Sequence, residues 1–274
     1  MIGSFLPEQS RRVREPAVAG RFYPRNPVEL RAQVESFLAS ALVPKPSLAP
    51  KAIIAPHAGY IYSGPVAASA YASLTSVRDT IKTVVLIGPA HFVPVRGVAL
   101  ASTSAFETPL GPVDVDLEAS AKLRSLPFVS VSDDAHRPEH CLEVQLPFLQ
   151  VMLSDFRILP LVVGDATDEQ VARLLDSVWG GPETLLVISS DLSHYLDPLS
   201  TARLDRATAE AIEAGSPERI ENQQACGRVA IAGLLIAARR HNLHARTLDL
   251  RHSGDAGGPR DWVVGYGAFV FSSG

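Results

Sequence analysis

Three histidines in this sequence follow three separate apolar segments. His57 stands in IIAPHAGY, His91 in VLIGPAHF and His194 in VISSDLSHY. Each apolar run has the composition of a buried strand and ends at turn-forming residues. In an open parallel sheet, ligands bind at the carboxyl ends of the strands, and neutral imidazole is the commonest transition-metal ligand. The pattern therefore indicates a shared metal site, although each histidine could instead make only local hydrogen bonds in its loop.

Two further residues could complete such a site. Asp191 precedes His194 by three residues, and it could orient an imidazole, bind a metal or cap a following helix. Cys226 lies just before the helical pattern that begins after Gly227. The positive helix end and Arg228 favour its thiolate, which would be a soft metal ligand or a nucleophile. The alternative for Cys226 is a small buried hydrophobe.

A third histidine-rich segment, HRPEH at residues 136–140, matches the H-x-x-E-H pattern of some zinc peptidases. That chemistry needs both histidines on one helix. Pro138 in the middle removes a backbone donor and clashes with the preceding turn, so we reject the peptidase interpretation. His140 and Glu143 are three residues apart at an expected helix start, where they could face one site or make a capping interaction.

Composition excludes several classes of function. The 274 residues are 46% apolar and 20% charged, with no repeat or long linker, which predicts a single domain over residues 1–274. A net charge of −4 argues against nucleic acid or an anionic membrane as partner. The first residues contain too short an apolar run for a signal peptide, and no segment is long enough to span a membrane. With two cysteines, a reducing cytoplasm is expected.

Predicted strands alternate with predicted helices along the chain. Asn26 can cap the first helix, with Pro27 at its first position. Near-continuous Val/Ile/Leu runs indicate an α/β fold, with a largely parallel or mixed central sheet flanked by helices on both faces. A hairpin with its turn near Gly111 adds antiparallel character. Further helices are expected at 65–74, 116–123, 142–153, 168–178, 202–214 and 228–240, and strands at 52–55, 83–87, 158–163, 185–189 and 263–271.

Seven motifs, taken together, resemble those of a known family. REPAVAGRFYP, IIAPHAGYIYSG, GPAHFVP, FETPLGPVDVD, EHCLEVQLPFL, VISSDLSHY and ACGRVAIAGLL occur in this order. They are similar to motifs of the Memo family, whose bacterial and archaeal members are often called AmmeMemoRadiSam system protein B. The resemblance runs from about Arg14 to the C-terminal strand. It implies a fold similar to the class III extradiol ring-cleavage dioxygenases, in which two histidines and a carboxylate bind non-heme Fe(II).

The resemblance also implies roles for site residues. His57 and His91 match the metal-binding histidines, and Cys226 takes the place of the carboxylate. His194 matches the acid/base histidine, with Asp191 beside it. A thiolate in place of the carboxylate shifts preference toward copper or zinc and adds an oxidisable ligand. A mononuclear iron or copper ion, with zinc as an alternative, is the cofactor expected.

The expected substrate site adds aromatic residues to His140 and Glu143. Phe22 stands at the family's aromatic position, and with Tyr62 it could form one wall of a cleft, although core packing is the better explanation for any single one of these rings. The function expected is metal-dependent redox activity on an unknown small molecule. The alternative is a non-catalytic module that binds a peptide or protein in a vestigial cleft. A role beside radical-SAM partners is implied only by the family's name, and a homo-oligomer is left open.

Overall fold

A computed structural model of the chain describes residues 12–42, 48–259 and 261–274. The stretch considered for a signal peptide lies largely outside these residues. The strands are β1 Val13–Arg14, β2 Pro50–Ala55, β3 Thr83–Pro89, β4 Val98–Leu100, β5 Ala105–Phe106, β6 Val113–Asp114, β7 Val129–Val131, β8 Arg157–Val163, β9 Thr184–Ser189, β10 His194–Leu196, β11 Leu243–His252 and β12 Val263–Ser273. The helices are α1 Pro27–Ser40, α2 Tyr60–Ala72, α3 Leu117–Leu123, α4 Asp133–His136, α5 Leu146–Met152, α6 Asp168–Ser177, α7 Pro198–Glu213 and α8 Arg228–Arg240, with 3₁₀ turns at Glu143–Gln145, Pro217–Arg219 and Ser253–Ala256.

The main sheet is mixed, with a parallel centre. Among the described residues it has nine strands, in the order β10-β12-β2-β9-β3-β8-β4-β7, with β11 also paired to β12. Strands β2, β9, β3 and β8 run parallel, whereas β12 is antiparallel to β2 and β4 is antiparallel to β8. This arrangement confirms the predicted α/β class.

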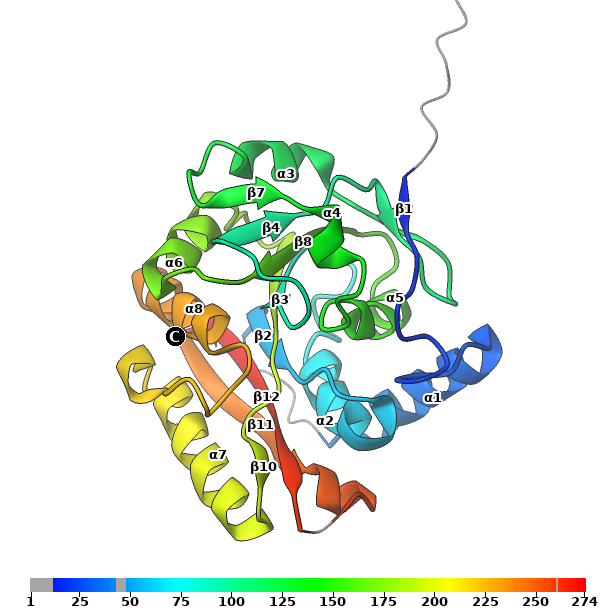
Figure 1. Cartoon of the computed structure of the whole chain (residues 1–274), viewed down its shortest axis with the longest axis vertical. Helices are drawn as coiled ribbons and strands as arrows, with labels where there is room; N and C mark the ends of the chain where they lie inside the picture. Colours follow the sequence, from blue (N-terminus) through cyan, green and yellow to red (C-terminus); the bar gives the residue numbers. More distant parts are fainter. Residues whose placement is uncertain (1–11, 43–47, 260) are drawn as a thin grey trace, which may run out of the picture.

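Helices cover both faces of this sheet (Figure 1). Side chains of the central strands alternate between two apolar layers, so that Ile53 and Val84 belong to one and Ile54 and Val85 to the other. The first layer is completed by α1, α2 and α5, and the second by α6, α7 and α8. Burial on both faces explains why the central strands are continuous apolar runs. No helix in the described part of the chain has the length and apolar character to cross a membrane.

The start of the first helix agrees with the sequence, whereas two later helices begin earlier than expected. Asn26 accepts hydrogen bonds from the first amides of α1, and Pro27 is its first residue, as predicted. The next helix begins earlier than expected, at Tyr60, and contains Pro65. Helix α7 also begins earlier, because Asp197 caps it. The helix expected at 142–153 is instead a 3₁₀ turn followed by α5.

The predicted hairpin is shorter than expected. Strands β5 and β6 pair across the turn that contains Gly111, and with β1 they form a separate three-stranded sheet. Strand β4, which precedes the hairpin in the chain, pairs with β7 and β8 of the main sheet. Strand β11 was not predicted, although it pairs with β12 over almost its whole length. Five of its ten residues are charged or histidine, and three of those five are exposed, so its sequence lacks a strong apolar pattern.

The parallel centre positions the histidine loops. Strands β2, β9 and β3 are adjacent, and they end at Ala55, Ser189 and Pro89. Because they run in the same direction, the loops that follow them leave the sheet at one edge. These loops carry His57, Asp191 and His91, so the fold brings together residues that are far apart in the sequence.

Candidate metal centre

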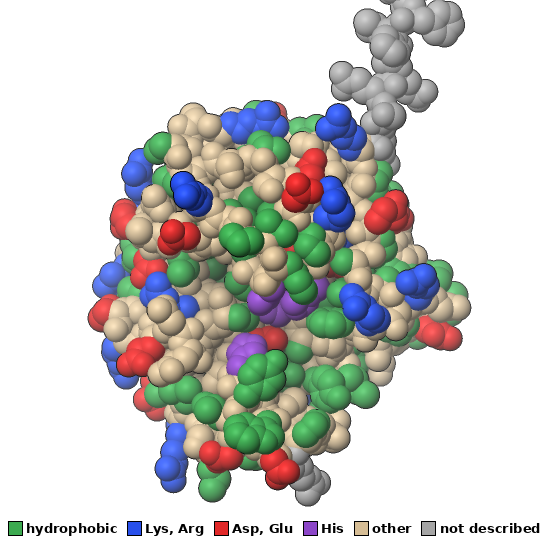
Figure 2. Space-filling model, in the orientation of Figure 1, with side chains coloured by type: hydrophobic (Ala, Val, Ile, Leu, Met, Phe, Trp, Pro, Cys, Tyr) green, Lys and Arg blue, Asp and Glu red, His purple; other side chains and the backbone are tan. Residues whose placement is uncertain are grey.

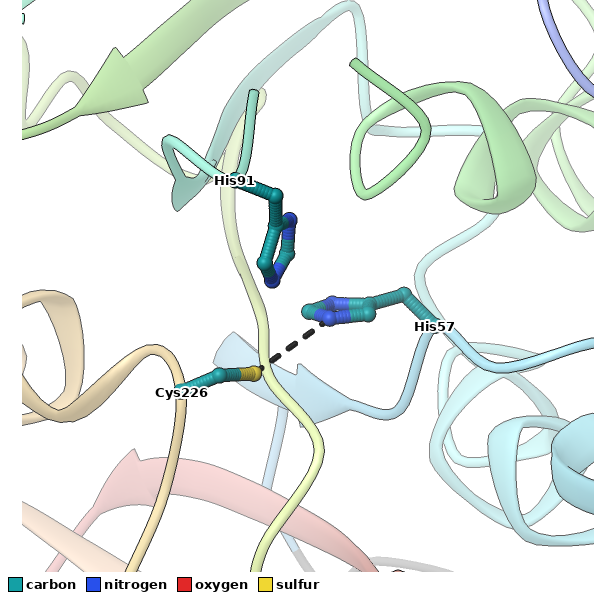
Figure 3. Close-up of side chains that lie close together, drawn as sticks. All are labelled: His57, His91 and Cys226. Atoms are coloured by element: carbon teal, nitrogen blue, oxygen red, sulfur yellow. Dashed lines mark hydrogen bonds between the residues drawn. The ribbon is translucent and has the colours of Figure 1, made fainter. Parts of the chain in front are cut away.

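His57, His91 and Cys226 form a compact cluster at this edge. One donor atom from each side chain lies within 4.8 Å of the other two. The thiol sulfur of Cys226 is 3.3 Å from Nε2 of His57, and the two imidazole rings are 5.2 Å apart. Figure 3 shows the three side chains pointing toward one another from the loops after β2 and β3 and from the segment before α8. The fold thus brings His57, His91 and Cys226 together. His194, the third histidine predicted to converge, belongs to neither group of close donor atoms in the described part of the chain.

The spacing of these donors fits a metal ion. Metal–nitrogen bonds of about 2.0–2.1 Å and metal–sulfur bonds of about 2.3 Å in tetrahedral geometry place neighbouring N and S donors about 3.5 Å apart. The observed separations of 3.3 Å, and of no more than 4.8 Å within the cluster, need only small side-chain adjustments to reach this value. Three protein ligands are also the number that catalytic zinc sites use, which leaves a position for water or substrate.

Hydrogen bonds assign the tautomer of His57. Its Nδ1 is 2.9 Å from the hydroxyl of Ser189, which donates to the carbonyl of Cys141 at 2.6 Å and accepts from the amide of Gln145 at 2.8 Å. Because the hydroxyl proton is already used, Nδ1 must be the donor, and the lone pair of Nε2 faces Cys226. Burial lowers the pKa of His57 to about 3, so the ring stays neutral, as a metal ligand must be.

Glu139 fixes the tautomer of His91. Its carboxylate accepts from Nδ1 of His91 at 2.9 Å and from the backbone amide of His91 at 2.7 Å. The amides of His140 and Cys141 also donate to it, at 2.9 and 3.1 Å. Burial alone would raise the pKa of Glu139, but these hydrogen bonds lower it to about 2. The carboxylate is therefore charged, fixes the proton on Nδ1 and leaves Nε2 of His91 free to bind a metal.

Glu139, His91 and His140 also have donor atoms within 4.8 Å of one another. Both oxygens of Glu139 already accept hydrogen bonds, so we assign it to the orientation of His91 rather than to a second ion. Glu139 was missed as a site residue. Two sequence signals include it, the segment HRPEH and the family motif EHCLEVQLPFL, but neither indicates that its carboxylate orients His91.

The expectation that its surroundings favour a thiolate at Cys226 is wrong for the protein without an ion. Burial, and next the charge of Asp191, raise the pKa of Cys226 to about 12. Arg228 does not stabilise the sulfur, because its guanidinium pairs with Asp168 at 2.7 and 3.2 Å. A bound cation would supply the missing positive charge, since coordination deprotonates a thiol.

Asp191 supports the His57 loop instead of capping a helix. One of its oxygens accepts from the backbone amide of His57 at 2.7 Å, and the other lies 4.0 Å from Nε2 of His57. Burial raises the pKa of Asp191. The chain then enters β10 rather than a helix, and this short strand begins at His194. Tyr195, the next residue, has φ 58°, a left-handed conformation that is strained for a tyrosine.

Aromatic rings lie next to the cluster, and two of them belong to Phe22 and His140, which were predicted to border a substrate site. The ring of His140 lies 4.9 Å from that of His91 and 5.5 Å from that of His57, and Phe22 meets it edge-on at 4.9 Å. Burial lowers the pKa of His140 to about 4. Phe92, which was not predicted, lies 5.7 Å from His140 and is 57% exposed. Figure 2 shows histidine side chains gathered in the middle of one face, with hydrophobic side chains around them.

The structure contradicts the prediction that Glu143 belongs to the substrate site. Its carboxylate is fully buried and accepts from the guanidinium of Arg14, from the hydroxyl of Tyr23 at 2.5 Å and from the amides of Ala17 and Val18 at 2.7 and 3.0 Å. Its hydrogen bonds therefore anchor the N-terminal segment. They do not direct the side chain into a site shared with His140.

Tyr62 is half-buried on α2, next to the C-terminal part of the chain. It lies near Tyr266 of β12, a residue that was not predicted and is almost completely buried. Burial and then the charge of Asp191 raise the pKa of Tyr266. These rings extend the aromatic surroundings toward Asp191. No sequence signal marked Tyr266, because it belongs to an ordinary apolar strand.

Comparison with known proteins identifies the family. A family model described as "Memo-like protein" matches residues 14–270. The chain belongs to the Memo family. A MEMO1 family protein of Aquifex aeolicus is 37% identical over 271 residues, which cover 95% of this chain and 99% of the relative. One from Aeropyrum pernix is 38% identical over 284 residues, covering 94% and 99%. The solved structure of an uncharacterized protein from Escherichia coli K12 aligns with a TM-score of 0.48 and 11% identity, over 78% of this chain and 98% of that one.

Membership in the Memo family confirms the resemblance seen in the motifs. In this Memo family chain, IIAPHAGYIYSG contributes His57, GPAHFVP contributes His91 and ACGRVAIAGLL contributes Cys226 to one cluster. EHCLEVQLPFL begins with Glu139, which orients His91. Several of the motifs that identify the family are therefore the segments that build the candidate metal centre.

Proposed function

We propose that this Memo family protein binds one transition-metal ion through His57, His91 and Cys226, and that it uses the ion for redox chemistry on a small substrate. Iron or copper is the ion proposed, with zinc as an alternative. The observation that carries the proposal is the cluster itself: three donor atoms within 4.8 Å of one another, brought together from three distant segments. Buried acceptors hold the proton on the far nitrogen of both imidazoles, as second-shell partners do in metal sites.

The surrounding residues are proposed to transfer protons and to bind the substrate. An ion bound here would supply electron transfer and an open position for an oxygen ligand. His194 and Asp191 are proposed to move the substrate proton. An oxygen of Asp191 lies 4.0 Å from Nε2 of His57, and His194 is close enough to His57 and Asp191 to influence them electrostatically. Burial raises the pKa of Asp191. Phe22 and Tyr62 are proposed to bind the substrate and exclude water, together with the neutral ring of His140.

Metal analysis tests the proposal. Protein purified without chelator and reconstituted anaerobically should contain about one ion per chain. The His57→Ala/His91→Ala variant should contain almost none. His241→Ala is a matched control, because His241 stacks on Trp179 at the surface and belongs to neither metal-binding group. Equal, near-zero metal in the wild type and the double variant would count decisively against the proposal.

Absorption spectroscopy tests whether Cys226 is a metal ligand. A bound copper or ferric ion should give a thiolate-to-metal charge-transfer band, and Cys226→Ser should abolish that band while the protein remains folded. A band that persists in Cys226→Ser would remove the sulfur from the ligand set and leave only the two imidazoles.

A second candidate function is the non-catalytic binding of a peptide or protein in the same cleft. The observation that favours it is the exposure of two aromatic side chains beside the histidines, Phe92 at 57% and Tyr195 at 68%. Metal-dependent O₂ uptake would support the redox proposal. Peptide binding that continues unchanged after complete removal of metal would support the second candidate instead.

A further inference from the structure

Asp205 is a buried carboxylate that the proposed function does not use. It lies on α7 and is only 4% exposed. One of its oxygens accepts a hydrogen bond from the backbone amide of Ser193 at 3.1 Å. The carboxylate also lies so close to the backbone of Gly265 that a Cβ atom there would overlap it. Asp205 is therefore fixed against the segment that leads into His194.

The backbone that carries His194 is tightly constrained. The carbonyl of Ser193, just before it, accepts a hydrogen bond from the amide of Gly265 at 2.8 Å. The pairing of β10 with β12 shifts its register between His194 and Leu196. Tyr195, at this shift, has φ 58°, and such strain persists only where surrounding contacts hold the chain in place. Contacts with α7 and β12 thus fix the position of the strand that presents the imidazole.

The charge of Asp205 acts on two histidines from different strands. Burial raises the pKa of Asp205 to about 6, whereas its hydrogen bonds with Ser193 and then the charges of His194 and His252 act in the opposite direction. His194 belongs to β10 and His252 to β11. The carboxylate therefore lies within electrostatic range of the histidine that is proposed to transfer protons.

Folding explains the hydrogen bond of Asp205 but not its charge. The oxygen of an asparagine amide would accept from Ser193 as a carboxylate does, without a charge to bury. Because burial raises the pKa of Asp205, the ionised carboxylate lowers the stability of the folded protein at neutral pH. This loss indicates that the charge serves something other than folding.

We propose that Asp205 is a positioning residue for His194: it holds the strand that carries the imidazole, and its negative charge favours the protonated ring. A proton accepted by His194 would stay on the imidazole, and Asp205 would remain a carboxylate. A metal ion at the candidate centre would disfavour a second positive charge nearby, so a proton acceptor beside it benefits from a counter-charge. The catalytic value of this pairing rests on the proposed function, but the pairing itself does not.

Asp205 is suited to this role because it lies outside the candidate metal centre. Asp191 also acts on His194, but its carboxylate is bound to the amide of His57 and lies beside the ring of that proposed ligand. Asp205 belongs to neither group of close donor atoms in the described part of the chain. Its charge can therefore act on His194 without coordinating the ion.

NMR of metal-free, isotope-labelled protein tests the pairing. At pH 7, above the pKa of Asp205, the ring nitrogen signals of His194 give the ratio of protonated to neutral imidazole. Asp205→Asn keeps an acceptor for the Ser193 amide but removes the charge, so this ratio should fall about 3–10-fold. Asp197→Asn is the matched control. Asp197 is nearer to His194 in the sequence and accepts from two backbone amides of α7, but it is exposed to water. Asparagine caps a helix equally well, and water screens the lost charge, so the ratio should stay almost unchanged.

The outcomes separate this proposal from the metal proposal. A ratio that falls in Asp205→Asn alone, with a Tm equal to or above that of the wild type, would support the pairing. An unchanged ratio, or an equal fall in both variants, would overturn it. A lower Tm in Asp205→Asn would show that folding needs the charge, and this result would also overturn the proposal.

Oxygen uptake tests the catalytic role. In metal-loaded protein, Asp205→Asn should lower the rate of metal-dependent O₂ uptake several-fold at unchanged metal content. An unchanged rate would overturn the role of Asp205 in proton transfer. A fall in the NMR ratio in a protein that never binds metal would refute only the proposed function.

Discussion

Glu143 provides the sharpest test of how the N-terminal segment is held against the site. Its buried carboxylate receives four hydrogen-bond donors: the Arg14 guanidinium, the Tyr23 hydroxyl and the amides of Ala17 and Val18. The guanidinium of Arg14 also donates to carbonyl oxygens of the 136–139 segment. The substitution Glu143→Gln keeps the shape of this side chain but removes its charge and one acceptor oxygen.

The expected loss of stability is large. The side chains of Arg14 and Glu143 are 3% and 0% exposed, so the remaining guanidinium would be a buried charge without its counter-ion. Removing one partner of a buried ion pair costs about 3–5 kcal/mol. Because glutamine retains one acceptor, we expect about 3 kcal/mol for Glu143→Gln. At about 2–4 °C per kcal/mol for a domain of this order of size, the Tm should fall by about 6–12 °C.

Urea unfolding followed by circular dichroism measures this effect. The double variant Arg14→Met/Glu143→Gln removes both charges, so its loss should be smaller than the sum of the two single losses by about 0.5–3 kcal/mol. Metal content per folded chain should stay unchanged in Glu143→Gln, since the carboxylate makes no contact with the three proposed ligands. Arg14→Met alone completes the cycle.

Two results would refute this reasoning. A destabilisation below about 1 kcal/mol would mean that the ion pair does not matter for folding. Strictly additive losses in the double variant would mean that the two side chains are not coupled. If Glu143→Gln instead weakened ligand binding while stability stayed at the wild-type value, the original prediction of a substrate-binding role would be restored.

Three further outcomes are expected. Glu139→Gln should weaken metal binding about 10–100-fold in a chelator competition, because it removes the charged acceptor of His91 Nδ1; an unchanged affinity would contradict the orienting role. Burial lowers the pKa of His136 to about 4, below its ordinary value of 6.5. The stability that the neutral imidazole contributes is therefore complete above about pH 6.5. It falls as the pH drops toward 4, by up to ~1.4 kcal/mol per pH unit. Urea unfolding at about pH 7.5 and 5 should therefore show a shallower pH dependence in His136→Gln, and equal slopes would be inconsistent with a buried neutral imidazole. Gly265→Ala should lower the unfolding free energy by about 1–3 kcal/mol, because its Cβ would overlap the carboxylate of Asp205, and adding Asp205→Ala should recover part of the loss.

The elements were predictable where local signals are strong. The cap at Asn26 marked the start of α1, and the continuous apolar runs marked β2, β3, β8 and β9. Strand β11 was not predicted, because its half-buried and charged side chains show little apolar periodicity. The early start of α2 was missed because Gly59 offers no side-chain cap to mark it.

The sequence by itself predicted that the loops carrying His57, His91 and His194 would meet, because the parallel strands before them deliver their following loops to one edge of the sheet. The tertiary structure groups His57 and His91 with Cys226, and it places Asp191 of the third loop against the backbone of His57. Only the tertiary structure decided what each of these side chains does there. The partner of His91 lies 48 residues away in Glu139, and that of His57 lies 132 residues away in Ser189. Hydrogen bonding and burial depend on which distant segments pack together, and no local pattern in the chain encodes that contact. For the same reason, the spacing of Glu143 three residues after His140 suggested a site residue, whereas its packing makes it the buried anchor of the N-terminal segment.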